Sequence, residues 1–202
     1  RDLSGNNPVK REQHLNIIIE ETDRLTQIVN DMLDLSKLES GAQKLDYSTF
    51  DIAQCMAEIV HRYEGVSERM GYQIHLTLDE PCMVRCDESK IDRVIGNLIN
   101  NAINYTSKED KQVFVTQRNL PQCVRIEVRD TGDGIEEDKI KLIFDKYYRS
   151  ENHKREVVGT GLGLSIVKEI LKMHNYNYGV NSKLGEGSTF WFEIRDIVPP
   201  EK

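Results

Sequence analysis

The sequence predicts an α+β sandwich, a mixed sheet backed by helices, preceded by one long helix of a helical bundle. Two observations predict this class. Residues 8–40 repeat apolar side chains at alternating spacings of three and four, whereas from Phe50 onward helical patterns mix with short strands in antiparallel hairpins. The 202 residues are 38% hydrophobic and 30% charged, so the chain holds enough apolar material for a packed core.

The first segment is typical of a helical hairpin. Residues 1–7 are turn-rich and suit its loop, Pro8 suits a first helical turn, and Gly41 suits a helix end. The apolar seam between them consists of Leu15, Ile18, Thr22, Leu25, Val29 and Met32, widened by Ile28, Leu35 and Leu38. A helix of this kind cannot bury its stripe alone, so we expect a partner helix from a preceding segment or from a second subunit.

The remainder of the chain alternates between two apolar periodicities. Helices are predicted where apolar side chains recur on one helical face: 51–70, 88–105, 136–144 and 161–174. Strands are predicted where shorter apolar runs lie between turn residues: 73–78, 83–86, 113–118, 124–130, 177–182 and 188–195. Residues 145–158 are polar without a period and predict a loop, and the tail 198–202 is expected to fray.

Charge and composition exclude several classes of partner. The 27 Lys and Arg against 34 Asp and Glu give a net charge of −7, which argues against nonspecific nucleic-acid binding. No run approaches the roughly 18 apolar residues of a membrane span, so we expect a cytoplasmic chain without membrane contact. The chain begins with Arg1 rather than Met, which suggests a piece of a longer protein. The cysteines lack a metal-site spacing and are expected to be free thiols: Cys55, Cys82, Cys86 and Cys123.

Three glycine clusters lie in the second half, over 130–135, 159–165 and 185–190. The second is the most specific, because flexible backbone N–H groups at a helix N-terminus bind phosphates. It lacks the Lys-Ser/Thr pair of a P-loop. It also follows an irregular loop rather than the first strand of a parallel unit, which excludes a Rossmann site.

Polar side chains beside these glycines suggest nucleotide chemistry. Asp130 ends an apolar strand, where a carboxylate can accept a hydrogen bond from an exocyclic amine such as that of adenine; a turn aspartate is the alternative. Helix 88–105 carries several asparagines, and Asn97 and Asn101 share one face. Amide oxygens suit Mg²⁺, which bridges phosphates, although a solvated polar face is an equal alternative for the isolated helix.

Taken in order, these motifs resemble the catalytic, ATP-binding half of a sensor histidine kinase of a two-component system. The matching boxes are the N box at 97–105, the G1 box at 130–135, the F box at 143–149, the G2 box at 159–165 and a last glycine motif at 185–190. The resemblance implies a Bergerat-type two-layer α/β sandwich with a lid over 146–158. It divides the chain into a remnant of the dimerisation and phosphotransfer hairpin (1–41), a linker (42–49), a catalytic ATP-binding domain (50–197) and a tail (198–202).

The resemblance also implies a site. Asp130 would accept from the adenine amine, Asn101 would be the main Mg²⁺ ligand, Asn97 would lie near the phosphates, and Arg149 would reach the terminal phosphates. Asn97, Asn101 and Arg149 would thus be the catalytic residues. The other implied nucleotide contacts are Asn104, Tyr105, Gly132, Gly134, Ile135, Lys146, Tyr148, Gly159, Thr160, Gly161, Leu162, Gly163 and Thr189. The family often has a basic residue at position 104, so the phosphate contact there would be weaker or made by a neighbour.

The implied activity is transfer of the γ-phosphoryl group of ATP, with Mg²⁺, to a histidine, and then to a response-regulator receiver domain. The parent would be a homodimer, and most such kinases are tethered to a membrane through upstream segments. The family's acceptor motif, His-Glu-Leu-Arg-Thr-Pro, has no counterpart here, and His14 lacks the following acid. We therefore expect nucleotide binding without autophosphorylation.

Two other functions share these motifs. ATPases of the gyrase, Hsp90 or mismatch-repair type activate water with a glutamate four residues before the Mg²⁺-binding asparagine. The matching residue here is Asn97, whose amide cannot take a proton from water. A non-catalytic nucleotide switch is the other alternative, favoured if nucleotide binds but no histidine substrate is phosphorylated.

Overall fold

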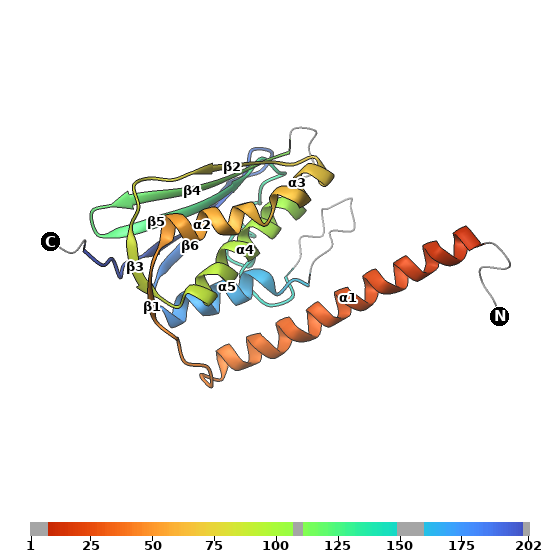
Figure 1. Cartoon of the computed structure of the whole chain (residues 1–202), viewed down its shortest axis with the longest axis horizontal. Coiled ribbons are helices and arrows are strands. Elements are labelled where there is room, and N and C mark those ends of the chain that lie inside the picture. Colours follow the sequence, from red (N-terminus) through yellow and green to blue (C-terminus); the bar gives the residue numbers. More distant parts are fainter. Residues whose placement is uncertain (1–7, 107–110, 149–159, 200–202) are drawn as a thin grey trace.

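The computed structural model of the chain describes residues 8–106, 111–148 and 160–199, and it has two parts (Figure 1). One is a two-layer body of helices on a sheet. The other is α1 (Pro8–Glu39), a single helix whose C-terminal half lies along the body while its N-terminal half projects as an arm. No helix in the described ranges combines the length and apolarity that crossing a membrane needs.

The main sheet has five strands in the order β2-β4-β5-β7-β6. Their bounds are Gln73–Thr77 for β2, Gln112–Leu120 for β4, Cys123–Asp130 for β5, Gly187–Ile194 for β7 and Asn177–Lys183 for β6. The pair β2–β4 is parallel and the other pairs are antiparallel, which confirms the predicted mixed sheet. This topology brings the end of β5 and the start of β7 side by side, with Asp130 opposite Ser188.

Three helices cover one face of the sheet: α2 (Ile52–His61), α4 (Glu88–Tyr105) and α5 (Gly163–Met173) (Figure 1). The apolar face predicted for helix 88–105 is fully buried in α4. It meets inward-facing side chains of the central strands, such as Val115, Ile126 and Phe192, each with no exposed surface. Burial at roughly 25 cal/mol per Å² of apolar surface is the main force holding the two layers together.

Two predicted elements differ from the structure, and one strand was not predicted. Helix 51–70 is two helices, α2 and α3 (Glu64–Met70), because the chain turns at Tyr63, whose hydroxyl donates to the Gly96 carbonyl at 3.2 Å. The helix predicted over 136–144 is wrong. Its backbone forms successive i→i−3 turns, with the N–H groups of Lys139 and Leu142 donating to the carbonyls of Glu136 and Lys139.

The third difference is the first strand of a small two-stranded sheet, which was not predicted. β1 (Ser48–Asp51) begins inside the predicted linker and pairs with β3 (Met83–Cys86) in antiparallel register. The segment is short and lacks a clear alternation, so its strand conformation depends on its partner. Asp51 then caps α2 by accepting from the Ala53 N–H at 3.0 Å.

The apolar stripe of α1 is buried near the C-terminal end of the helix and exposed toward its N-terminal end. Leu35 and Leu38 are each 4% exposed, and this end of α1 packs against α5. Farther toward the N-terminus the seam is open, with Leu25 61% and Ile18 60% exposed. The body therefore covers only the last turns of α1, and the predicted partner for the remaining stripe is not supplied by the described part of this chain.

Candidate functional site

Two adjoining cavities lie between α4, the segment that follows β5, and the start of α5. Their volumes are about 250 Å³ and 280 Å³. They share one wall, made by Asn101, Tyr105, Ile143, Tyr148 and Leu164. The pair forms one elongated site, which we describe as a first cavity near the sheet and a second cavity near α1.

A buried carboxylate lies in the first cavity. Asp130 is 3% exposed, and its Oδ1 atom accepts from the Gly132 N–H at 2.8 Å and the Ser188 N–H at 3.3 Å. These backbone donors hold the carboxylate in one orientation. The surrounding wall is largely apolar and includes Ile135 and Phe190. An apolar cavity with one fixed acceptor suits a flat ring that carries an amine.

Glycines bring the backbone close together around this cavity. Gly134 lines it with φ +71°, and a Cβ atom there would lie 2.1 Å from the Lys183 carbonyl oxygen. A Cβ atom on Gly132 would lie 2.4 Å from the Tyr105 carbonyl oxygen. Only glycine fits these two positions, because one needs a left-handed backbone and both need the missing side chain.

The second cavity is polar and faces the N-terminal end of α5. Its walls include Asn97 and Asn101 of α4, together with Gly161 and Gly163. The residue before α5 makes no side-chain cap, so the first-turn N–H groups are arranged to attract an anion. The Nδ2 atom of Asn97 is shielded from solvent and has no hydrogen-bond partner among the described residues, which marks it as a donor for a ligand.

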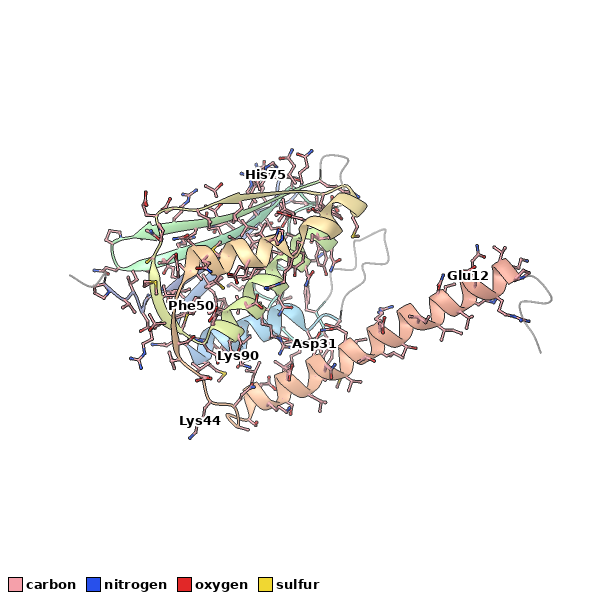
Figure 2. All side chains as sticks on the ribbon, in the orientation of Figure 1. Glu12, Asp31, Lys44, Phe50, His75 and Lys90 are labelled. Atoms are coloured by element: carbon pink, nitrogen blue, oxygen red, sulfur yellow. The ribbon has the colours of Figure 1, made fainter. Side chains whose placement is uncertain are left out.

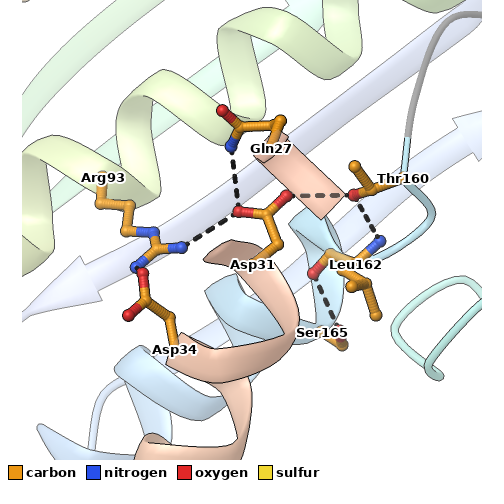
Figure 3. A network of polar contacts seen from close by, with 7 residues as sticks. All are labelled: Gln27, Asp31, Asp34, Arg93, Thr160, Leu162 and Ser165. Carbon is orange, nitrogen blue, oxygen red and sulfur yellow. Dashed lines mark hydrogen bonds and ion pairs between the residues drawn. The ribbon is translucent and has the colours of Figure 1, made fainter. Parts of the chain in front are cut away.

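Helix α1 closes the far side of the second cavity with a carboxylate (Figure 3). Asp31 is 7% exposed and accepts from three side chains: Gln27 Nε2 at 3.1 Å, Arg93 Nη2 at 3.2 Å and Thr160 Oγ1 at 3.2 Å. Arg93 also donates to Asp34 at 2.6 Å. Thr160 Oγ1 in turn accepts from the Leu162 N–H at 3.2 Å, so one network joins α1, α4 and the α5 loop.

Most of the predicted site residues come together in these cavities. The first cavity contains Asn101, Tyr105, Asp130, Gly134, Ile135 and Tyr148. The second contains Asn97, Asn101, Asn104, Tyr105, Tyr148, Thr160, Gly161 and Gly163. Two predicted residues, Arg149 and Gly159, and most of the predicted lid lie outside the described residues.

Four predicted residues do not line either cavity. Gly132 lies behind Asp130 and holds its carboxylate. Leu162 has no exposed surface and belongs to the core. Lys146 pairs with Glu39 of α1 at 2.6 Å instead of pointing to the site. Thr189 is replaced by its neighbour Ser188, because successive residues of β7 face opposite sides of the sheet.

Several lining residues were missed by sequence reasoning. In the first cavity they are Asp133, Glu136, Lys139, Ile143, Leu164, Leu184, Ser188 and Phe190, and in the second Gln27, Asp31 and Asn100. Many of these residues lie beside the motif residues in the sequence, and that position could have indicated them. Gln27 and Asp31 could not, because their helix was interpreted as part of a separate helical bundle.

The chain matches two family models. Residues 86–197 match the family described as histidine kinase-, DNA gyrase B- and HSP90-like ATPases. Residues 1–41 match the His Kinase A (phospho-acceptor) domain. The first match covers α4, α5 and all five motifs, whereas α1 lies outside it.

Known proteins with similar sequences are sensor proteins. The chain is 35% identical over 196 residues to an uncharacterized sensor-like histidine kinase, ycf26, of Pyropia yezoensis, and 36% identical over 197 residues to drug sensory protein A of Synechocystis sp.. It is 34% identical over 185 residues to the sensor protein kinase WalK of Staphylococcus aureus. These alignments cover 90–92% of this chain but only 30%, 29% and 44% of the three relatives.

Solved structures share the fold. Full-length ShkA in complex with AMPPNP superposes with a TM-score of 0.83 at 26% identity, covering 96% of this chain and 40% of ShkA. The histidine kinase ThkA in complex with the response regulator protein TrrA superposes with a TM-score of 0.76 at 24% identity, covering 98% of this chain and 54% of ThkA. The second likeness shows the common architecture alone.

Proposed function

Because this chain belongs to the histidine kinase-, DNA gyrase B- and HSP90-like ATPase family, as the catalytic region of a two-component sensor histidine kinase, we propose that its two cavities bind Mg²⁺-ATP for phosphoryl transfer to a histidine. One observation carries the proposal: the fixed carboxylate of Asp130 in an apolar cavity adjoins a second cavity lined by asparagines and by the α5 N-terminus. A nucleotide has the same division into a flat base and an anionic tail.

The first cavity matches the adenine base, and the second cavity matches the phosphates. The adenine amine would donate to Asp130, with the base against Ile135 and Phe190. The phosphates would accept from the N–H groups around Gly161 and Gly163. Asn101 lines both cavities, so its amide oxygen could hold Mg²⁺, which would neutralise phosphate charge, and Asn97 would donate its unpartnered amide N–H to a phosphate oxygen.

The residues favour transfer over hydrolysis. Phosphoryl transfer depends mainly on positioning and charge neutralisation, and bound Mg²⁺ supplies part of that neutralisation. Hydrolysis additionally needs a base beside the attacking water. The side chain at the corresponding place is Asn97, an amide that cannot accept a proton, so ATP would persist until a histidine reaches the second cavity.

Other proteins would complete the reaction. The 202 residues contain no histidine in the family's acceptor motif, so we propose that the acceptor lies outside them. The phosphoryl group would then pass to the receiver domain of a response regulator. The match of residues 1–41 to a phospho-acceptor domain model and the open stripe of α1 support a homodimeric parent.

Calorimetric titration with a non-hydrolysable ATP analogue tests the site. Asp130→Asn is the informative variant, because its amide oxygen can still accept from Gly132 and Ser188 while its N–H₂ group would oppose the adenine amine. A hydrogen bond to a charged group contributes about 1.5–3 kcal/mol, so we expect binding roughly 10- to 100-fold weaker. Asp133→Asn removes a carboxylate from the same cavity without that acceptor role and is the matched control.

Two results would contradict the proposal. One is equal affinity of wild type and Asp130→Asn, and the other is no binding by wild type at millimolar analogue. The transfer step is tested separately, by adding a histidine-bearing hairpin with ATP and Mg²⁺ and following phosphohistidine formation. Normal analogue binding without any transfer would favour the nucleotide switch over the kinase.

A further inference from the structure

The charged side chains that line the two cavities are mostly acidic. Four carboxylates line them: Asp130, Asp133 and Glu136 in the first cavity and Asp31 in the second. Figure 2 shows Asp31 between α1 and the body. In the described ranges of the chain, Lys139 is the single basic side chain that lines either cavity. A ligand with several negative charges is repelled by these carboxylates, so this one ammonium group has a particular weight in its binding.

Lys139 lies toward the opening of the first cavity. Its side chain is 27% exposed, whereas Asp130, the proposed partner of the adenine amine, is 3% exposed. The Lys139 ammonium pairs with the Glu136 carboxylate at 2.6 Å, and the Lys139 backbone N–H donates to the Glu136 carbonyl at 3.0 Å. Ile143 and Tyr148, which line both cavities, follow in the same segment of the chain. The ammonium is therefore held by a neighbour one turn away, between the base end of the site and solvent.

The order of groups in a nucleotide indicates what Lys139 can reach. With the base at Asp130 and the outer phosphates near Gly161 and Gly163, the α-phosphate follows the sugar and is the phosphate nearest to the first cavity. A lysine ammonium is a point charge on a flexible four-carbon stem, so it can turn from one anion to another. A partly exposed ion pair contributes little to stability, so the loss of the Glu136 contact costs little.

We propose that Lys139 binds the α-phosphate of the nucleotide and exchanges its partner Glu136 for that phosphate when the nucleotide enters. This inference rests on the proposed function, and it assigns a phosphate contact to a residue outside the glycine motifs and the asparagine helix. Lys139 supplies its charge with or without Mg²⁺, in contrast to the metal proposed at Asn101. The first phosphate of the nucleotide should therefore add to the affinity even in a chelator.

The test is calorimetric titration with adenosine, adenosine monophosphate (AMP) and a non-hydrolysable ATP analogue, each in a chelator. We expect Lys139→Gln to bind AMP and the analogue about three- to tenfold more weakly, between the effects of an exposed ion pair and of a buried charged hydrogen bond, and to bind adenosine as wild type does. Lys139→Arg keeps the charge and should retain most of the AMP affinity. Lys141→Gln removes the same charge from an exposed position that lines neither cavity and should change no affinity.

Glu136→Gln tests the exchange of partners. This variant removes the carboxylate that competes for the Lys139 ammonium, so AMP should bind more tightly than in wild type. The same change made in Lys139→Gln should have a smaller effect, because no ammonium is left to be released. A non-additive pair of this kind supports the exchange, with circular dichroism confirming that each variant is folded.

Several outcomes would overturn the inference while the dependence of analogue binding on Asp130 keeps the proposed function intact. Equal AMP affinity of wild type and Lys139→Gln excludes the phosphate contact, and an equal loss for adenosine assigns Lys139 to the base or the sugar instead. Equal losses in Lys139→Gln and Lys141→Gln indicate a general effect of surface charge. Additive effects of the Glu136 and Lys139 changes exclude the exchange. Absence of analogue binding by wild type contradicts the proposed function as well.

Discussion

The imidazole of His174 accepts a hydrogen bond at Nε2 from the backbone N–H of Asp87, at 3.2 Å, and donates from Nδ1 to the Ile170 carbonyl at 2.9 Å. His174 is 5% exposed and follows α5, while Asp87 caps α4 by accepting from the Lys90 N–H. The neutral ring, with its proton on Nδ1, thus joins the two helices that form the walls of the site. A protonated ring would present an N–H group to the Asp87 N–H.

We expect the free energy of unfolding to depend on the charge of His174. Burial lowers the pKa of His174 below its ordinary value, and the bond to the Ile170 carbonyl only partly opposes this. In the window between the lowered folded pKa and the ordinary unfolded one, the unfolded chain binds more protons, so stability falls as the pH falls through it. Urea unfolding between pH 5 and 8, with the range set by the ordinary histidine pKa of about 6.5, measures the slope.

The control for this prediction is His174→Gln, whose amide can offer an acceptor and a donor without titrating. It should be less stable than wild type near neutral pH but should lose this part of the pH dependence. An identical slope in both proteins would assign the dependence to other groups.

Gly134→Ala should destabilise the protein and abolish analogue binding. The new Cβ atom would lie 2.1 Å from the Lys183 carbonyl oxygen, at a φ of +71° that disfavours side chains. Strain of this kind costs on the order of 1–3 kcal/mol before any clash is counted. Gly71→Ala is the matched control, because Gly71 has the same φ with nothing within 4 Å. Equal shifts of thermal unfolding in both variants would show that the close approach to Lys183 is unimportant.

Local patterns predicted most of the fold. Helix 88–105 and strand 83–86 have the predicted bounds, because a capping aspartate and a regular apolar period act within the segment itself. Residues 136–144 carry apolar side chains at helical spacing but form i→i−3 turns. There the apolar residues serve the cavity: Ile143 lines both cavities and Phe144 packs against Tyr178, so tertiary contacts override the local pattern.

For the candidate site too, local patterns predicted the residues within short motifs but not those that depend on tertiary contacts. Asp130, Asn101 and Gly163 were predicted because each lies in a short motif whose chemistry is visible in a few neighbouring residues. Asp31 was missed because its partner Thr160 is 129 positions away, and no local pattern indicates that distance. Ser188 lines the first cavity and the predicted Thr189 does not, because a shift of one residue along a strand reverses the face of the sheet.

Asn101→Ala should remove the Mg²⁺ dependence of analogue binding. The amide of Asn101 lies where the two cavities meet, and its oxygen is the proposed metal ligand. Loss of one ligand should weaken binding about tenfold or more with Mg²⁺ present and change it little in a chelator. The four affinities, two proteins with and without Mg²⁺, form a complete cycle. Equal weakening in both conditions would instead indicate a direct contact of Asn101 with nucleotide.

Leu25→Lys should weaken self-association of the chain. Leu25 is 61% exposed and belongs to the same stripe as Ile18 and Val29, which are 60% and 54% exposed. Burying one leucine contributes about 1.5–3 kcal/mol, so a charge there should raise the dissociation constant at least tenfold if this stripe is the interface. Sedimentation velocity over a range of protein concentrations measures it.

The control places the same lysine on a different face of the helix. Asn30 is an exposed polar residue outside the apolar seam, so Asn30→Lys changes the net charge equally but leaves the stripe intact. A stripe-mediated dimer predicts normal association for Asn30→Lys and weak association for Leu25→Lys. Equal weakening by both would show that charge, rather than apolar burial along α1, determines association, and a monomeric wild type at high concentration would exclude this stripe as a sufficient interface.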